Sequence, residues 1–392
     1  MASRKLTIAQ ILPEMDSGGV EMVTLDFGSF LAEKGHRSIV ISKGGCLVPE
    51  LVKNGSEHIS CPHIGEKSPR CLPYIPWLRK FILEEKVDVL HLRSRLPAWV
   101  AYLAWKSLPV KKRPLLVTTF HGFYSINAYS AVMTKGQKVI AISNVISDHI
   151  KQEYHTPEDR IQIIHEGIDE AQFDSDGIDS KRLDAVKKRW CLAQSVQSDK
   201  VDPLVILLPA RITRLKGHDI FIESLSLIRS LDWIAVCAGS HDVNSSYFDS
   251  LKKRVVDKGL ENRILFPGNC EDMPAAIKLS AIVVSSSSEP ESFGRAAVEA
   301  QSMNTPVVAT AHGGAIETIC HNKTGILVKP GSADEMASAF KKIMENKEVY
   351  TVLSSQGRDR VKRLFTKKVM CEKTLALYFD LSNFTMGNFG AV

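Results

Sequence analysis

The chain has 392 residues, too many for one ordinary hydrophobic core and suited to two domains of about 150–200 residues each. Hydrophobic residues make up 44% and charged residues 24% of the sequence, which argues against a disordered, fibrous or membrane-spanning protein. The net charge of +6 is uneven, because residues 1–140 hold 19 Lys and Arg against 11 Asp and Glu. A solvated face explains this basic half most simply, and attraction to an anionic membrane surface or a phosphorylated molecule is the functional alternative.

The first apolar run, Leu6–Leu12, is too short for a membrane-spanning helix and has no small-residue cleavage site. We therefore expect a buried strand and a cytoplasmic protein. The eight cysteines are scattered, with no C-x-x-C motif and no ligand-like grouping with histidine. Reduced, mostly buried thiols are expected in place of disulfides or a zinc site.

Short apolar runs alternate with longer amphipathic stretches along the whole chain. Their near-continuous hydrophobicity indicates strands covered by helices on both faces, and the alternation predicts an α/β protein with doubly wound parallel sheets. In the first half the expected strands are Leu6–Leu12, Ser38–Ser42, Val87–Leu92, Leu115–Phe120, Lys138–Ser143 and Ile161–His165. In the second half they are Leu204–Pro209, Trp233–Ala238, Ile264–Phe266, Ile282–Ser285, Pro306–Ala309 and Gly325–Val328.

A polar stretch from Glu170 to Asp202 separates these two sets of strands. We expect two Rossmann-like domains, residues 1–185 and 204–364, joined by a linker at 186–203. Residues 365–392 are expected to form a helix and tail that pack back on the first domain. Because ligands bind at the carboxyl ends of strands in open parallel sheets, the two domains would face each other across a cleft.

Gly18 and Gly19 lie between the first expected strand and the helix that follows it. A tight turn would explain them. Alternatively, the glycines let the backbone approach an anion at the helix N-terminus. The G-x-G-x-x-G fingerprint is absent, which lowers the odds of a dehydrogenase.

Arg211 and Lys216 follow the first strand of the second half. At the carboxyl end of a strand, the arginine can bind a diphosphate bidentately and the lysine adds a mobile point charge. The same pair would stabilise the charge on a departing nucleoside diphosphate. The alternative is that both cations are merely solvated.

Glu291 and Glu299 belong to the most informative motif, Glu289–Ala300, which follows a strand and opens a helix. If both were helical, their backbones would lie about 12 Å apart at ~1.5 Å per residue, beyond the ~5–9.5 Å of a glycosidase carboxylate pair. Two separate carboxylates, one near a sugar and one near a ribose, fit better. N–H groups around Phe293 and Gly294 can meet a phosphate or a sugar hydroxyl. A helix cap with one solvated glutamate is the alternative.

Taken in order, these motifs resemble the retaining GT-B glycosyltransferases of family 4. The resemblance covers nearly the whole chain and rests on Arg211 with Lys216-Gly217, Glu291–Glu299, Pro306–Ala309, Gly313–Glu317, Ser17–Glu21, His121–Ser125, Val139–Ser143 and Ile164–Asp169. Within the family, the sequences of the segments His91–Arg95 and Gly294–Gln301 are similar to those of lipopolysaccharide core transferases.

The resemblance implies transfer of a hexose-like sugar from a nucleoside diphosphate sugar to a glycan acceptor, in lipopolysaccharide core or other surface polysaccharide synthesis. It implies a GT-B fold and retained configuration, with no cofactor, no metal and no nucleic-acid partner. The basic N-terminal half fits peripheral contact with the inner face of the cytoplasmic membrane. A sugar-nucleotide epimerase or phosphorylase on the same fold, or a non-catalytic nucleotide-sugar- or glycan-binding protein, is the alternative.

The resemblance also implies roles for individual residues. Arg211 and Lys216 would hold the donor diphosphate, Glu291 the donor-sugar hydroxyls and Glu299 the ribose. The implied donor site consists of Gly18, Gly19, Arg211, Lys216, Glu291, Ser292, Phe293, Gly294 and Glu299, and the implied catalytic residues are His121, Arg211, Lys216 and Glu291. His121 would lie beside the sugar ring, and a structural histidine is the alternative.

Arg93 and Arg95 close another strand and are candidates for binding an acidic or phosphorylated glycan acceptor, with internal ion pairing as the alternative. The D-x-D sequence at Asp174–Asp176 resembles the metal-binding motif of the other large glycosyltransferase fold, but its position favours a solvated loop. The sequence departs from the family pattern at three positions. Glu166 replaces a basic or small residue, Ala311 replaces an acidic residue, and Asn304 replaces a glycine whose positive φ asparagine tolerates.

Overall fold

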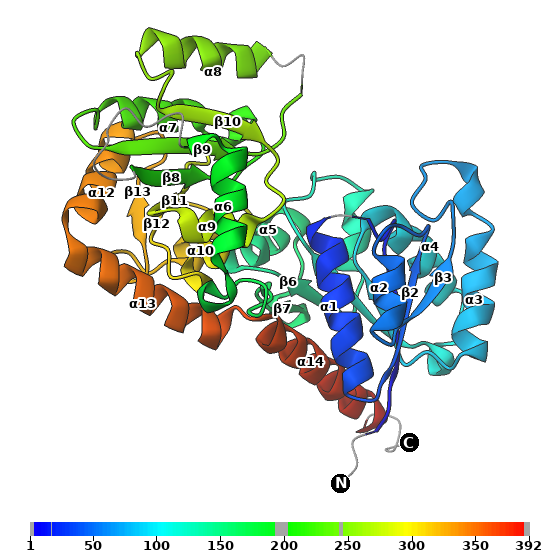
Figure 1. The fold of residues 1–392 in the computed structure, drawn as a ribbon. Helices are drawn as coiled ribbons and strands as arrows, with labels where there is room; N and C mark the ends of the chain where they lie inside the picture. Colours follow the sequence, from blue (N-terminus) through cyan, green and yellow to red (C-terminus); the bar gives the residue numbers. More distant parts are fainter. Residues whose placement is uncertain (1–3, 17, 193–202, 243–245, 388–392) are drawn as a thin grey trace. The chain divides into compact units, whose positions relative to one another are not determined.

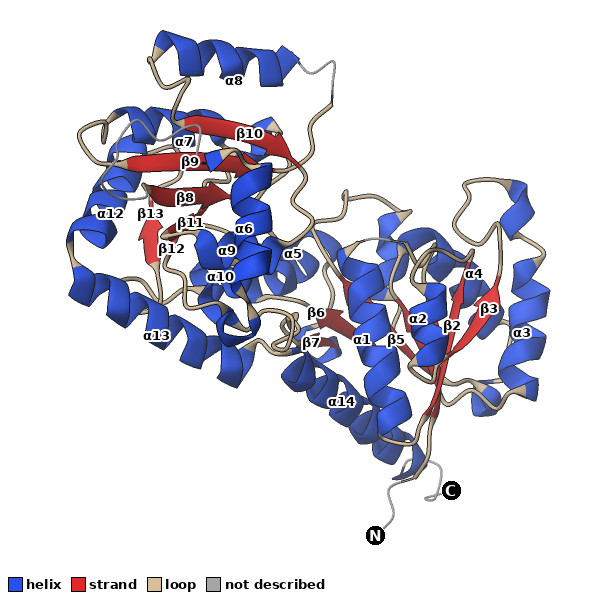
Figure 2. Ribbon diagram, viewed as in Figure 1, coloured by secondary structure: helices blue, strands red, loops and turns tan. Residues whose placement is uncertain are grey.

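The computed structural model describes residues 4–16, 18–192, 203–242 and 246–387 (Figure 1). The chain forms two compact units. Unit 1 comprises Met1–Gly167 and Lys367–Val392, and unit 2 comprises Ile168–Thr366. Each unit is a parallel sheet with helices on both sides (Figure 2). The prediction of two doubly wound, Rossmann-like sheets is therefore confirmed.

Unit 1 contains a seven-stranded parallel sheet with the order β3-β2-β1-β4-β5-β6-β7. Its strands are β1 (Thr7–Ile11), β2 (Arg37–Ser42), β3 (Glu57–Ser60), β4 (Val89–Leu92), β5 (Leu115–Phe120), β6 (Lys138–Ala141) and β7 (Ile161–Ile163). The sequence did not predict β3, because this short edge strand reads Glu-His-Ile-Ser and has no buried residue. β3 pairs with β2 at the edge of the sheet, where Ile39 lies beside Glu57. A strand at the edge of a sheet is partly solvated, so it can be polar.

The helices of unit 1 are α1 (Gly19–Glu33), α2 (Val48–Lys53), α3 (Tyr74–Glu84), α4 (Arg95–Lys106), α5 (Asn144–Tyr154) and α14 (Lys367–Gly387). Short 3-10 turns occupy Pro69–Cys71, Val110–Lys112, Ser130–Thr134 and Glu158–Arg160. The core joins β-branched strand residues such as Ile8 and Val117 to Phe27 of α1 and Tyr378 of α14.

The C-terminal helix α14 completes the interior of unit 1. Its Tyr378 is fully buried and meets Phe27 edge-on, with ring centroids 5.8 Å apart. The Tyr378 hydroxyl also lies 2.6 Å from Nδ1 of His91, whose Nε2 lies 2.7 Å from the Thr119 hydroxyl. Burial holds the pKa of His91 well below its usual range. Helix α14 is therefore hydrogen-bonded to strand β4, and His91 of β4 is bonded in turn to strand β5.

Unit 2 contains a six-stranded parallel sheet with the order β10-β9-β8-β11-β12-β13. The strands are β8 (Leu204–Leu208), β9 (Trp233–Ala238), β10 (Ile264–Gly268), β11 (Ile282–Ser285), β12 (Val307–Thr310) and β13 (Ile326–Val328). The helices are α6 (Ser180–Arg189), α7 (His218–Ser226), α8 (Ser246–Asp257), α9 (Met273–Leu279), α10 (Arg295–Ser302), α11 (Ala315–Thr318), α12 (Ala333–Glu345) and α13 (Lys347–Leu364), with 3-10 turns at Ser175–Gly177 and Arg214–Lys216.

The boundary between the units lies at Gly167 and Ile168, whereas the sequence placed it after residue 185. The reason is that α6 packs on α9 of unit 2, where Arg182 forms a bidentate ion pair with Asp272 at 2.7 Å. Composition alone could not reveal this pairing. Asn304 has a φ of +57°, as the asparagine at a glycine position predicted.

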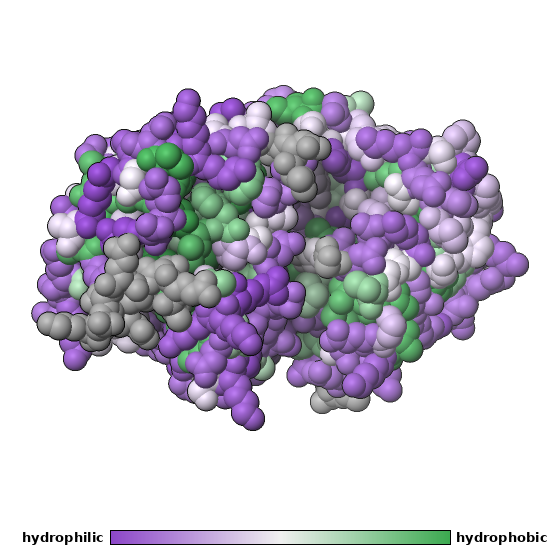
Figure 3. Space-filling view, turned by 45° about the horizontal axis from the view of Figure 1, so that its top comes forward, coloured by the Kyte–Doolittle hydropathy of each residue, from purple (hydrophilic) through white to green (hydrophobic). Residues whose placement is uncertain are grey.

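The visible face in Figure 3 is mostly hydrophilic, with hydrophobic residues in scattered groups. Among the described residues, no helix combines the length and apolar character needed to span a membrane.

Candidate functional site

The strand order of unit 2 reverses beside β8, because the chain runs outward through β9 and β10 and returns at β11. In open parallel sheets this switch point is where a ligand-binding crevice forms, and the loops that leave β8 and β11 lie beside it at the carboxyl edge of the sheet. The loop after β8 carries Arg211 and Lys216, and the loop after β11 carries Glu291. The two predicted clusters are thus brought together by topology.

Lys216 and Glu291 form an ion pair across this crevice. Lys216 Nζ donates to Glu291 Oε1 at 2.6 Å, and the two side chains are 28% and 23% exposed. The Ser287 hydroxyl donates to the same carboxylate oxygen. Arg211 is exposed, and within the described part of the chain its guanidinium has no ion-pair partner. One cation is thus positioned by a carboxylate, and a second lies open to an anion.

Hydrogen bonds to backbone carbonyls join the two loops. The Ser286 hydroxyl donates to the Lys216 carbonyl at 2.9 Å, and the Ser288 amide donates to the Leu215 carbonyl at 3.0 Å. Gly217 adopts a φ of +63°, and a Cβ on it would lie 1.9 Å from the Ser286 carbonyl oxygen. The glycine after Lys216 is needed both for this conformation and for this close approach.

Two consecutive glycines, Gly313 and Gly314, pack against the backbone of Glu291 and Phe293. The Gly314 amide donates to the Glu291 carbonyl at 2.7 Å. A Cβ on Gly313 would lie 2.4 Å from the same carbonyl oxygen, and one on Gly314 would lie 2.4 Å from the Phe293 Cα. The Gly-Gly sequence after β12 therefore supports the loop after β11. In the sequence this Gly-Gly pair was part of the family resemblance and had no predicted role in the site.

Glu299 lies on α10, whose first residue is Arg295. Arg295 Nε donates to Glu299 Oε1 at 2.7 Å, and only 13% of the glutamate side chain is exposed. Burial raises the pKa of Glu299, and the positive charge of Arg295 opposes that rise. The sequence did not single out Arg295 as a partner of this carboxylate.

The remaining predicted donor residues differ in what they present. Phe293 is buried and packs edge-on against Phe365, with centroids 5.7 Å apart, so its side chain belongs to the core. Ser292 is partly exposed, and Gly294 precedes α10 with a φ of +85°. If the segment 292–294 contacts a ligand, it does so without the Phe293 ring, which is part of the core.

In unit 1 the predicted glycines stand at the start of α1. Gly18 has a φ of 177°, an extended conformation open to any residue, and a Cβ on Gly19 would meet no atom within 4 Å. A tight turn therefore does not require these two glycines. Both are exposed, which leaves the N-terminus of a 15-residue helix uncovered by side chains at these positions.

His121 follows β5 and is paired with Glu166. His121 Nδ1 lies 3.1 Å from Glu166 Oε1, and the side chains are only 6% and 13% exposed. Burial lowers the pKa of His121, and the bond to Glu166 partly offsets this effect. Nε2 of His121 is buried without a hydrogen-bond partner in the described residues and lines a small pocket with Arg93 and Glu166. The unusual acid at position 166 is thus the partner of the histidine.

The two candidate acceptor arginines behave differently. Arg93 is 3% exposed; its Nε donates to Gln10 Oε1 at 2.8 Å, and its guanidinium lies over the Phe27 ring. Interior groups therefore hold the Arg93 side chain at the wall of the small pocket beside His121, and its contact with an acceptor stays a prediction. Arg95 is partly exposed and lies 5.0 Å and 5.4 Å from the ring centroids of Tyr124 and Tyr129.

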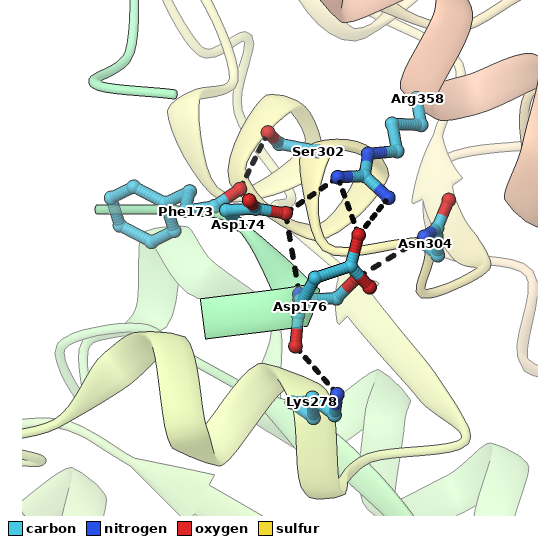
Figure 4. Close-up of polar contacts among 8 residues, drawn as sticks. Phe173, Asp174, Asp176, Lys278, Ser302, Asn304 and Arg358 are labelled. Atoms are coloured by element: carbon cyan, nitrogen blue, oxygen red, sulfur yellow. Dashed lines mark hydrogen bonds and ion pairs between the residues drawn. The ribbon is translucent and has the colours of Figure 1, made fainter. Parts of the chain in front are cut away.

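Asp174 and Asp176 lie in a loop, as expected, and Asp176 is 78% exposed, but the loop is held more firmly than the sequence interpretation suggested. Both carboxylates pair with Arg358 of α13, as Figure 4 shows. The segment between them is fixed further, because Lys278 donates to the Ser175 carbonyl and Asn304 donates to the Ser175 hydroxyl at 3.2 Å. These bonds tie the start of unit 2 to helices α9 and α13 and to the turn after α10. Among the described residues, no group of three or more His, Cys, Asp or Glu could hold a metal ion.

A cavity of about 810 Å³ also occurs in unit 2, away from these residues. Leu204, Ile234 and Ala281 line it, and they stand at the amino ends of β8, β9 and β11. It therefore lies at the opposite edge of the sheet from Lys216 and Glu291.

Comparison with known proteins agrees with these features. The model for glycosyl transferases group 1 matches residues 193–360, and that for glycosyltransferase family 4 matches residues 17–172. The crystal structure of a glycosyltransferase from Rickettsia africae ESF-5 is 33% identical, covers 96% of this chain and 98% of its own, and superimposes with a TM-score of 0.85.

Two more distant structures share the fold. HepE from Anabaena, in complex with UDP and glucose, is 20% identical with a TM-score of 0.78 over 95% of this chain and 99% of its own. WaaG, a glycosyltransferase involved in lipopolysaccharide biosynthesis, is 16% identical with a TM-score of 0.70 over 95% and 99%. The fold, the matched motifs and the 33% identical relative lead to one conclusion: the chain belongs to the GT-B glycosyltransferases of group 1.

Proposed function

We propose that this glycosyltransferase moves a hexose-like sugar from a nucleoside diphosphate sugar to a glycan acceptor with retained configuration. The observation that carries the proposal is the Lys216–Glu291 pair at the crevice between β8 and β11. It sets a phosphate-binding cation beside a carboxylate that can accept hydrogen bonds from sugar hydroxyls. A sugar joined to a diphosphate presents a phosphate for the cation and hydroxyls for the carboxylate.

In this proposal Arg211 and Lys216 bind the diphosphate, together with N–H groups at the start of α10. When the donor binds, its phosphate competes with Glu291 for Lys216, and the freed carboxylate oxygen accepts from the sugar. The bond between the anomeric carbon and the diphosphate breaks while the acceptor oxygen bonds to the same carbon from the same face. The acceptor proton passes to the leaving phosphate, so no protein nucleophile is needed.

Fixed positive charge then accounts for most of the rate enhancement, because it stabilises the charge that develops on the leaving diphosphate. We propose that the side chains supply this charge without a metal or cofactor. In this proposal His121 lies beside the transferred sugar, and Gly18 and Gly19 at the start of α1 belong to the donor site. The similarity to lipopolysaccharide core enzymes favours a bacterial surface glycan as the acceptor and a cytoplasmic protein, in peripheral contact with the membrane if the acceptor is carried on lipid.

The test is a thermal-shift panel of UDP, GDP, ADP and their common sugars, with and without EDTA. At 100 times its dissociation constant, a nucleotide bound only by the folded state adds about 2.7 kcal/mol to stability. Lys216→Ala should remove the shift and lower turnover by roughly 10²–10³-fold. Lys252→Ala is the matched control, because Lys252 pairs with Asp249 on α8 of the same unit.

A clear shift with one nucleotide family, lost in Lys216→Ala and kept in Lys252→Ala, would support the donor site. If the folded wild-type protein gave no shift with any nucleotide, the proposal would be contradicted. Product analysis with and without acceptor separates transfer from epimerisation, because an epimerase converts the nucleotide sugar when no acceptor is present.

A further inference from the structure

The position of Arg295 is electrostatically unfavourable for its own helix. It is the first residue of α10, where the helix dipole already presents positive charge, and it lies four residues before Glu299. An ion pair within a helix is stronger when the acidic residue comes first, which is the reverse of this order. The stability of α10 alone therefore gives little reason for an arginine at this position.

The bond from Arg295 acts on a carboxylate that burial would otherwise neutralise. Only 13% of the Glu299 side chain is exposed, and burial raises its pKa. Arg295 Nε, 2.7 Å from Oε1, counteracts that rise. A protonated carboxyl group has an O–H of its own and loses acceptor strength, so it would bind a hydroxyl pair poorly. An ionised group can accept from two hydroxyls.

The two carboxylate oxygens of Glu299 differ in their hydrogen bonding. Oε1 accepts from Arg295, and in the described part of the chain Glu299 accepts no other side-chain or backbone bond. Oε2 is therefore left for a ligand. A fixed carboxylate with one open oxygen suits the vicinal hydroxyls of a ribose.

Building on the proposed function, we propose that Arg295 is a positioning residue that keeps Glu299 ionised and oriented, so that the donor site selects ribonucleotides over 2′-deoxyribonucleotides. Arg295 acts through Glu299 and need not touch the nucleotide. Loss of its charge should therefore weaken ribose recognition in a way that depends on pH. Phosphate recognition by Arg211 and Lys216 should be retained.

The experiment measures dissociation constants of UDP, GDP and ADP and of their 2′-deoxy counterparts by calorimetry between pH 5.5 and 8.5. The wild-type protein should bind its preferred ribonucleotide roughly tenfold or more tightly than the deoxy form, the effect expected for a hydrogen bond to a charged group. In Arg295→Gln this ratio should fall toward one at low pH. It should recover as the pH rises, because a carboxyl with a raised pKa ionises only at higher pH.

Three variants make the result specific. Arg295→Lys should keep most of the selectivity, because it keeps the charge. Glu299→Gln should lose selectivity at every pH. Arg254→Gln, on α8 and 46% exposed, removes an arginine elsewhere in unit 2 and should leave the ratio unchanged.

The outcomes also separate this inference from the proposed function. Wild-type protein that binds no nucleoside diphosphate would overturn both. Wild-type protein that binds ribo and deoxy forms equally, or an Arg295→Gln protein with the wild-type ratio at every pH, would overturn only the role of Arg295. A lower melting temperature with an unchanged ratio would mean that Arg295 is merely structural, and would also overturn it.

Discussion

Replacing Gly217 by alanine tests whether the loops after β8 and β11 interlock as described. Gly217 has a φ of +63°, and an added Cβ would lie 1.9 Å from the Ser286 carbonyl oxygen. Gly259, in the same unit, has a φ of +61°, and a Cβ there would meet no atom within 4 Å. The two substitutions therefore share the same backbone strain, and only Gly217→Ala adds a collision.

The magnitudes follow from these contacts. A left-handed conformation costs alanine ~1–2 kcal/mol, which is the loss expected for Gly259→Ala. At Gly217 the Ser286 carbonyl oxygen must also move away by about 1.1 Å, because Cβ atoms in proteins essentially never lie closer than 3.0 Å to such an atom and the added Cβ would lie at 1.9 Å. Overpacking of this kind adds ~1–3 kcal/mol, so we expect Gly217→Ala to lose ~2–5 kcal/mol in total.

Urea unfolding followed by tryptophan fluorescence would measure both variants, because Trp233 is buried in the core of unit 2. Each kcal/mol corresponds to ~2–4 °C in the melting temperature of a domain of this size. Gly217→Ala should also weaken nucleotide binding, since a displaced Ser286 moves the loop that carries Glu291. Equal losses of stability in the two variants would refute the close approach of Gly217 to Ser286.

Two further predictions concern unit 2. Burial lowers the pKa of His218 to about 4. As the pH falls below 6.5, the histidine is therefore protonated in the unfolded state while it stays neutral in the folded state. The free energy of unfolding should decrease from pH 6.5 toward pH 4 for this reason. Urea unfolding across this range should give a shallower decrease for His218→Leu, by up to ~1.4 kcal/mol per pH unit, and an unchanged slope would contradict the burial argument. Arg358 is 18% exposed and pairs with two carboxylates, so Arg358→Ala should cost ~1–3 kcal/mol in the same assay, whereas Asp176→Asn, at a side chain 78% exposed, should cost less than ~1 kcal/mol. A larger loss for Asp176→Asn than for Arg358→Ala would show that the ion pairs of Arg358 contribute little to stability.

Apolar runs predicted most strands because a strand buried on both faces must be apolar throughout. The polar edge strand β3 carries no such signal, and its pairing with β2 was found only in the structure. The domain boundary was misplaced for a similar reason. The Arg182–Asp272 pair that assigns α6 to unit 2 joins residues 90 positions apart.

One contact within the candidate site could be anticipated, because both residues follow strands of the same parallel sheet. Lys216 and Glu291 were assigned to the donor site through the family resemblance, and the structure pairs them directly. Arg93 shows the limit of reasoning from a strand end, because a long side chain there can turn inward when partners such as Gln10 and Phe27 are available. The Glu166–His121 pair depends on a contact across 45 positions, and only the unusual acid hinted at it.

The return of the chain to unit 1 has a consequence for biosynthesis. Tyr378 and the rest of α14 are synthesised after all of Ile168–Thr366. Until then His91 lacks the Tyr378 hydroxyl and Phe27 lacks the Tyr378 ring, so the interior of unit 1 stays incomplete while the whole of unit 2 has already been made. A nascent chain stalled before Lys367 should therefore hold a complete unit 2 and an incomplete unit 1.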